Sequence, residues 1–104
     1  MVIYHIALRP DWEAAKAAGE YRVSTKGVTL EQEGFIHCSL RHQVGQTLAA
    51  FYTDTDDVVL LAIDPERLTA PVKHEAPAPG AEEFPHIYGP VPVNAVVNVT
   101  VPAR

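Results

Sequence analysis

Val58-Val-Leu-Leu-Ala-Ile63 is a run of apolar residues that stands between Asp57 and Asp64-Pro65. An apolar residue at every position is typical of a β-strand that is buried on both faces. The aspartates and the proline at its ends mark where the strand begins and ends. We therefore predict a central strand over residues 58–63, around which the rest of the chain is arranged.

Two further strands are predicted near the ends of the chain. Residues 2–8 are rich in β-branched and aromatic side chains, and strand alternation places Ile3, His5 and Ala7 on one face. Residues 95–101 are expected to form the closing strand, after a turn at Pro90-Val-Pro92. His5 should therefore project from the middle of a sheet.

Helices are predicted at residues 10–18 and 42–52. The first has Pro10 at its start and Gly19 after its Ala-rich body, and Trp12 is expected to pack beneath it. The second has the apolar stripe of an amphipathic helix. Its members stand at positions i, i+4, i+7 and i+8 and are Val44, Leu48, Phe51 and Tyr52.

Shorter elements are predicted between these. The spacing of Thr29 and Gln32 is that of a capping box and predicts one helical turn. Residues 35–39 are predicted to form a strand, in which Cys38 lies on the face opposite to His37 and Ser39. The remaining segments are expected to be short strands at 21–23 and 71–75 and a loop at 76–83.

The order of these elements predicts an α+β fold in a single compact domain over residues 1–104. We expect a mixed or antiparallel sheet with about two helices against it. No glycine-rich phosphate loop follows any strand, so neither a dinucleotide-binding motif of the doubly wound kind nor a P-loop is present.

Composition restricts the function further. The net charge is −5 with only eight Lys and Arg, which argues against broad binding to nucleic acid. No apolar run reaches the length of a membrane span, and the N-terminus has no secretory signal, so a cytoplasmic protein is expected. The lone cysteine, Cys38, cannot form an internal disulfide and fits a reducing compartment.

Three of the five histidines lie inside apolar runs. They are His5 in Val2-Ile-Tyr-His-Ile-Ala-Leu8, His37 in Gly34-Phe-Ile-His-Cys-Ser39 and His86 in Phe84-Pro-His-Ile-Tyr-Gly89. A buried imidazole needs a hydrogen-bond partner and can donate, accept or bind a metal near neutral pH. Neighbouring strands would bring His5 and His37 together, and a loop carrying His86 could close over them.

Each histidine has an alternative interpretation as a core side chain bonded to backbone. A three-histidine metal site is another, but no His-x-His or His-x3-His pair is present, and we expect no metal. A Cys-His hydrolase is disfavoured because alternation sends Cys38 away from His37.

Ser39 and Tyr88 are candidate ligand-binding residues near these histidines. Ser39 shares the face of His37 and could act as a nucleophile or a binding hydroxyl, or else cap the next helix. Tyr88 belongs to a stiff segment, Phe84-Pro-His-Ile-Tyr-Gly-Pro90, which is either a preformed binding edge or a rigid turn. Three acids are also candidates, of which the last two are expected to be solvent-exposed. They are Glu75, Glu82 and Glu83.

Several motifs together resemble the bacterial domain-of-unknown-function family 952. The most specific are Gly34-Phe-Ile-His-Cys-Ser39 and Phe84-Pro-His-Ile-Tyr-Gly-Pro90. Ile3-Tyr-His-Ile-Ala7, the Trp12 helix, Gln43-Val44 and Leu60-Leu-Ala-Ile-Asp64 extend the resemblance over nearly the whole chain.

That family is similar to the ADP-ribosyltransferase-like superfamily, whose split β-sheet holds NAD in a cleft. The resemblance implies that His5 contacts a ribose of NAD and that His37 matches the second histidine of the RNA 2′-phosphotransferase branch. His86 and Tyr88 would lie near the start of the late catalytic strand. Tyr88 or Tyr21 could stack on a nicotinamide ring.

The chain departs from the superfamily at one important point. Toxin-type transferases carry a Glu-x-Glu or Gln-x-Glu pair on the late strand, whereas this sequence has His86 and Tyr88 there. The leading hypothesis is an enzyme that binds NAD or a related nucleotide, with His37 and His86 as catalytic residues. The alternative is a noncatalytic small-ligand or protein-interaction module on the same fold.

Overall fold

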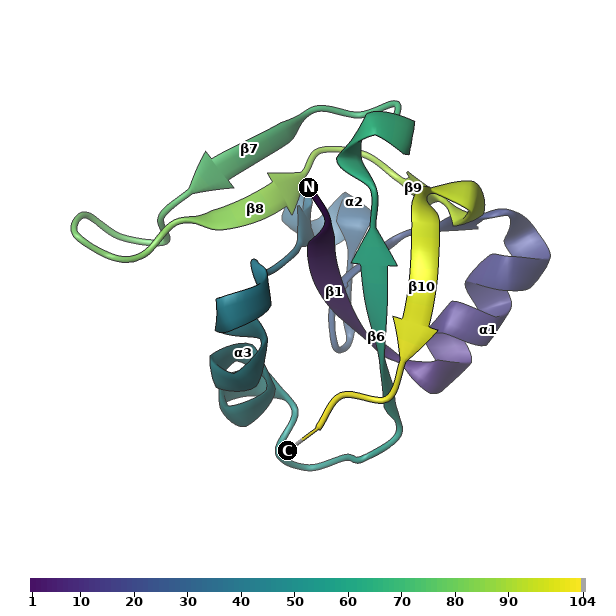
Figure 1. Cartoon of the computed structure of the whole chain (residues 1–104), viewed down its shortest axis with the longest axis horizontal. Coiled ribbons are helices and arrows are strands. Elements are labelled where there is room, and N and C mark those ends of the chain that lie inside the picture. The colour runs from purple at the N-terminus through teal and green to yellow at the C-terminus, as the bar shows by residue number, and fades with distance from the viewer. Residues whose placement is uncertain (104) are drawn as a thin grey trace.

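The computed structural model describes residues 1–103. Its central layer is a sheet in which β6 (Val58–Ile63) lies between β1 (Ile3–Leu8) and β10 (Val96–Thr100), antiparallel to both (Figure 1). The apolar run 58–63 is therefore the central strand, as predicted. Its alternate side chains are buried on opposite faces, because Val59 and Leu61 belong to one apolar cluster and Val58 to another.

A second three-stranded sheet has β8 (Phe84–Ile87) between β5 (Ile36–His37) and β7 (Val72–Glu75). Both pairings are antiparallel. Two two-stranded ladders complete the β-structure. They pair β2 (Glu20–Tyr21) with β9 (Val91–Pro92) and β3 (Val23–Thr25) with β4 (Val28–Thr29).

The α-helices lie where the sequence predicts them, with small shifts at their ends. Helix α1 (Arg9–Ala18) ends at Gly19, whose φ of 93° is the left-handed conformation that glycine adopts without strain. Helix α2 (Leu30–Glu33) begins with the predicted capping box, and α3 (Val44–Phe51) follows a 3-10 turn, η1 (Arg41–Gln43). Two further 3-10 turns are η2 (Pro65–Arg67) and η3 (Val93–Ala95).

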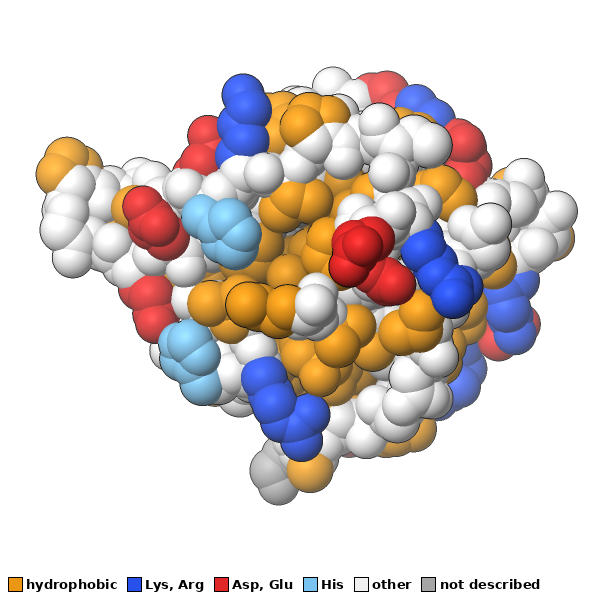
Figure 2. Space-filling model, turned by 45° about the horizontal axis from the view of Figure 1, so that its top comes forward, with side chains coloured by type: hydrophobic (Ala, Val, Ile, Leu, Met, Phe, Trp, Pro, Cys, Tyr) orange, Lys and Arg blue, Asp and Glu red, His pale blue; other side chains and the backbone are white. Residues whose placement is uncertain are grey.

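The apolar core fills both sides of the central sheet. The larger cluster includes Trp12 of α1 with Ile3 and Leu61, and the smaller one joins Leu48 of α3 to Ile6. The expected packing of Trp12 beneath its helix is thus confirmed. Figure 2 shows that hydrophobic side chains also gather in the middle of one outer face, with charged side chains mainly around them.

The predictions for three segments need correction. Strand 35–39 is reduced to β5, because Ser39 leaves it to exchange two backbone hydrogen bonds with Tyr4. Phe51 is 59% exposed instead of belonging to the buried stripe of α3. Residues 84–87 are neither a turn nor a loop but the middle strand of a sheet, so His86 is held by strand pairing.

The architecture is an α+β fold, as the sequence predicts. Among residues 1–103, no helix is long and apolar enough to span a membrane.

Candidate functional site

The three histidines converge on one cleft of about 620 Å³. Its walls come from β1, β3, β5, β8 and α3, so it lies where the central sheet, the second sheet and a helix meet. The lining residues of β1, β5 and β8 include His5, His37 and His86. A volume of this size is in the range that binds small organic ligands and cofactors.

His5 forms part of the cleft wall, but both its ring nitrogens are already bonded. Nδ1 lies 2.5 Å from the carbonyl oxygen of His37, and Nε2 lies 2.9 Å from the hydroxyl of Tyr21. The carbonyl can only accept, so Nδ1 carries the proton and the Tyr21 hydroxyl donates to Nε2. Burial keeps this ring neutral by lowering the pKa of His5 to about 4.

Tyr21 is buried beside His5 and does not line the cleft. Its side chain is only 1% exposed, and its ring meets that of His5 edge-on with centroids 5.0 Å apart. Burial raises the pKa of the Tyr21 phenol, which keeps the proton that His5 accepts in its hydrogen bond. Neither residue has a free polar atom for ribose, and Tyr21 has no free face for a nicotinamide ring. We therefore assign both to the support of the cleft.

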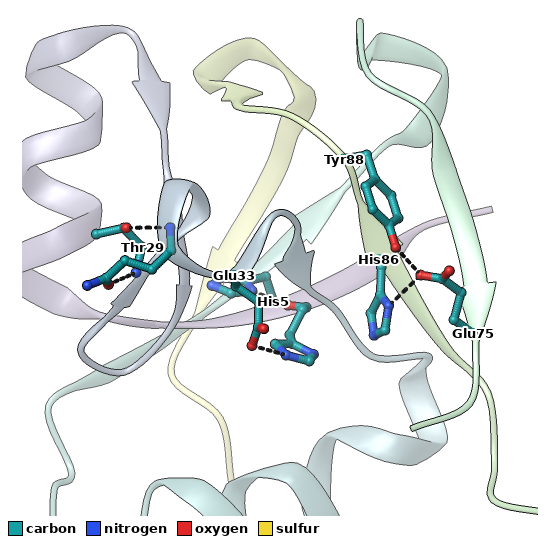
Figure 3. Close-up of polar contacts among 8 residues, drawn as sticks. His5, Thr29, Glu33, Glu75, His86 and Tyr88 are labelled. Atoms are coloured by element: carbon teal, nitrogen blue, oxygen red, sulfur yellow. Dashed lines mark hydrogen bonds and ion pairs between the residues drawn. The ribbon is translucent and has the colours of Figure 1, made fainter. Parts of the chain in front are cut away.

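His86 is oriented by a carboxylate from the neighbouring strand. Glu75 of β7 lies 2.8 Å from His86 Nδ1, and the Tyr88 hydroxyl donates to the same oxygen at 2.5 Å (Figure 3). These two hydrogen bonds, first that of Tyr88 and then that of His86, lower the pKa of Glu75. His86 Nε2 has no hydrogen-bond partner among residues 1–103, and the residue lines the cleft.

His37 is more exposed than His86. Its Nε2 lies 3.2 Å from Glu33 of α2, and its side chain is 38% exposed. The register of β5 and β8 sets His37 directly opposite His86, and their rings meet edge-on at 4.9 Å. Burial lowers the pKa of His37, the hydrogen bond to Glu33 opposes this shift, and the nearby His86 adds to it.

Aromatic rings and hydroxyls complete the walls. Phe35 stacks on His86 at 4.0 Å between ring centroids and meets His37 edge-on at 4.8 Å. Ser39 lies 3.1 Å from Thr47 of α3, which itself donates to a backbone carbonyl, so the Ser39 hydroxyl donates to Thr47. The lining residues include no Lys or Arg, so only a protonated histidine could offer a positive charge.

The sequence predicts part of this arrangement. His37, His86 and Ser39 line the cleft, whereas Tyr88 does not line it. The Tyr88 ring instead contacts the lining residue Phe35, with ring centroids 5.4 Å apart, and has the Lys73 ammonium 4.7 Å from its centroid. Glu75 was among the candidate acids. Its exposed companions at positions 82 and 83 lie outside the histidine cluster, as their loop position predicts.

Glu33 is the site residue that sequence reasoning missed. It stands four residues before His37, and the capping box at Thr29 already fixed the helical turn that carries it. That combination could have indicated a pairing of Glu33 with His37.

The surroundings of Cys38 disfavour its use as a nucleophile. Cys38 is buried, and burial raises the pKa of its thiol, so the reactive thiolate is disfavoured. Among residues 1–103, no group of three or more His, Cys, Asp and Glu side chains is placed to hold a metal ion.

The fold and this cleft define a small α+β domain with a histidine-lined, largely apolar pocket. The chain belongs to the family described as "Protein of unknown function (DUF952)", whose model matches residues 6–99. The resemblance found in the sequence is therefore confirmed for the family, while the wider superfamily stays a prediction.

Solved structures of protein CC0527 from Caulobacter crescentus are similar to this chain. Its crystal structure is 36% identical, with a TM-score of 0.82, and the match covers 96% of this chain and 84% of that one. Its solution NMR structure is 35% identical with a TM-score of 0.74, over 96% and 83% of the two chains. No curated protein matches the chain.

Proposed function

We propose that this protein is an ADP-ribosyltransferase-like enzyme that binds NAD, or a related ribose-phosphate nucleotide, in the histidine-lined cleft. The observation that carries the proposal is the pairing of His86 with Glu75 at the cleft wall. A histidine held by a carboxylate through one nitrogen and free at the other is the arrangement of a general acid or base.

The hydrogen bonds define what His86 can do. Glu75 accepts a hydrogen bond from the Nδ1–H group of His86. In the neutral ring Nε2 therefore has a lone pair that can remove a proton from the group to which ADP-ribose is transferred. Tyr88 donates to the same oxygen of Glu75 and acts as a positioning residue. Stacking on Phe35 fixes the plane of the ring, so the direction of Nε2 is set before a ligand binds.

The proposed transfer uses this base and one carboxylate. His86 Nε2 takes the proton of the acceptor, whose lone pair forms a bond to C1′ of the nicotinamide ribose. The bond from C1′ to the pyridinium nitrogen breaks, and its electron pair leaves with neutral nicotinamide. Glu33 lines the cleft beside His37, and its negative charge would stabilise the positive charge that develops at C1′.

The charge of the cleft favours one half of NAD. No Lys or Arg is among the lining residues, so a buried pyrophosphate would lack a strong partner. Phenyl rings such as Phe35 and Phe84 suit the nicotinamide ring instead. We therefore place nicotinamide and its ribose inside the cleft and the phosphates at its solvent side.

One observation favours a noncatalytic module as the second candidate function. Both carboxylates near the histidines are already hydrogen-bonded to them, Glu33 to His37 and Glu75 to His86. A domain that had lost the chemistry would still bind a small ligand or a protein segment in this apolar cleft, without turnover.

The test combines an NMR titration with an assay for released nicotinamide. NAD, ADP-ribose and nicotinamide are added to the wild type, to His86→Ala and to His74→Ala, which removes an exposed histidine outside the cleft. We expect shifts at His37 and His86, and nicotinamide release that falls at least about 100-fold in His86→Ala alone.

The outcomes separate the two functions. With water as the acceptor in this assay, shifts without release in the wild type would support the binding module over the transferase. Unchanged signals at both histidines with every ligand at millimolar concentration would overturn nucleotide binding itself.

A further inference from the structure

One buried hydroxyl in the cleft has no partner. Ser24 of β3 is fully buried and lines the cleft. Among residues 1–103, its Oγ is the one buried side-chain nitrogen or oxygen atom that has no hydrogen-bond partner. The other buried polar side chains are all bonded. They are His5, Ser39, Gln43 and His86.

An unpaired buried hydroxyl lowers stability, because folding removes its hydrogen bonds to water and returns none. Such a group is most readily explained when another molecule supplies the missing bond. Ser24 is placed for this, because it lines the same cleft as His37 and His86. No hydrogen bond has to be broken for rotation about its Cα–Cβ bond to turn the hydroxyl toward a ligand.

We propose that Ser24 determines ligand specificity by hydrogen-bonding an uncharged polar group, an amide or hydroxyl, on the aromatic ring of the bound ligand. A hydroxyl can donate or accept, so it suits both groups. A carboxylate would suit the cleft poorly, because no Lys or Arg lines it and Glu33 already brings negative charge. This inference rests on the proposed function only in that the cleft binds a ring-bearing ligand.

The experiment uses two probes of nearly equal shape, nicotinamide and nicotinate, which differ in charge. Dissociation constants are measured by NMR for the wild type, for Ser24→Ala and for the neighbouring hydroxyl variant Thr25→Ala. Thr25 also lines the cleft but is partly exposed, so it serves as a matched control. The thermal midpoint of each variant is recorded beside the affinities.

We expect the wild type to bind nicotinamide more tightly than nicotinate. Ser24→Ala should weaken nicotinamide binding about tenfold, corresponding to about 1.4 kcal/mol, without changing nicotinate binding or lowering the thermal midpoint. The midpoint should hold because alanine keeps the Cβ and removes only the unpaired atom. Thr25→Ala should leave the preference for the amide unchanged.

Three results would overturn the inference. Equal affinity of Ser24→Ala and wild type for nicotinamide would show that the hydroxyl does not touch the ligand. A lowered thermal midpoint or failure to fold in Ser24→Ala would show that Oγ has a structural partner such as a buried water. If NAD binds but nicotinamide alone does not, the proposed function stands while this ring-and-amide subsite fails.

Discussion

His5 sits in the middle of β1 with both ring nitrogens hydrogen-bonded inside the protein. An apolar strand that carries one imidazole looks the same in sequence whether that imidazole binds a ligand or supports the fold. Here Tyr21 and the His37 carbonyl settle the matter, because they leave no nitrogen free. The histidine at position 86 also lines the cleft, but its Nε2 has no hydrogen-bond partner among residues 1–103.

Removal of the Tyr21 hydroxyl should destabilise the protein. Tyr21→Phe leaves His5 Nε2 buried without a donor, so we expect the free energy of unfolding to fall by about 1–3 kcal/mol in urea denaturation. Tyr4→Phe is the matched control, because its hydroxyl accepts an exposed contact from Arg41, and a change within about 0.5 kcal/mol is expected. Equal stability of both variants would contradict the role of Tyr21.

The stability of the protein should fall in mild acid because of His5. Its pKa is about 4 in the folded protein and about 6.5 when exposed, so the unfolded chain binds more protons between these values. The stability that neutral His5 contributes is present above about pH 6.5 and is lost as the pH falls toward 4. The free energy of unfolding should fall by about 3 kcal/mol over this range.

Urea denaturation at several pH values measures this dependence. In His5→Gln the slope of stability against pH between 4 and 6.5 should become smaller than in the wild type. His74→Gln changes an exposed histidine and should keep the wild-type slope. An unchanged slope in His5→Gln would contradict a neutral buried His5.

At the scale of elements, β8 shows how a strand with a proline can lie inside a sheet. The C=O and N–H of a strand residue point to the same side, and the Pro85 carbonyl accepts a bond from Cys38. The missing N–H of Pro85 therefore faces the point just beyond the end of β5, where the ladder stops. Proline is usually excluded from central strands because it cannot donate a hydrogen bond to a neighbouring strand. At position 85 this costs little, because the ladder with β5 has already ended there.

Two glycines give opposite predictions for the same substitution. A Cβ on Gly89, just after β8, would lie 2.6 Å from the Cβ of Ala70, whereas Gly45 in α3 has open space. We expect Gly89→Ala to lower the free energy of unfolding by about 1–3 kcal/mol. Gly45→Ala should raise it by up to about 1 kcal/mol, because alanine favours the helix.

Thermal or urea unfolding of the two variants measures the difference. Ala70→Gly combined with Gly89→Ala should recover part of the loss, since it removes the atom that the new Cβ meets. A stabilised Gly89→Ala variant would show that the two segments are not packed at this distance.

At the scale of the whole molecule, the cleft depends on contacts between distant parts of the chain. Gln43 is fully buried and accepts a hydrogen bond from the backbone of Leu40 while donating to the carbonyl of Glu83. It thus joins the start of α3 to the β7–β8 loop, and Pro77 of that loop lines the cleft. Glu82 adds exposed contacts to His42 and Gln46.

Loss of the Gln43 side chain should loosen this connection. Gln43→Ala removes two part-buried hydrogen bonds, one to the Leu40 N–H and one to the Glu83 carbonyl, so we expect a loss of about 1–3 kcal/mol in stability. Amide hydrogen exchange in residues 76–83 should also become faster. Gln46→Ala removes an exposed contact of 3.3 Å to Glu82 and should change neither quantity strongly. Unchanged exchange in Gln43→Ala would show that the loop is held by other contacts.

The amino-acid sequence by itself determined the elements whose signals are local. The apolar run 58–63, the capping box at Thr29 and the Pro10 and Gly19 ends of the first helix all appear in the structure as predicted. Such signals depend on side-chain periodicity and on backbone hydrogen bonds within a few residues. For the same reason the α+β class could be derived from the order of the elements.

Only the tertiary structure decided what the histidines do. The pairing of β5 with β8 set His37 opposite His86, and the pairing of β7 with β8 brought Glu75 to Nδ1 of His86. The fold also bonded both nitrogens of His5 and left the Ser24 hydroxyl unpaired. These outcomes depend on strand register, which is fixed by the packing of side chains far apart in the sequence. Strand register therefore cannot be predicted from a local sequence pattern.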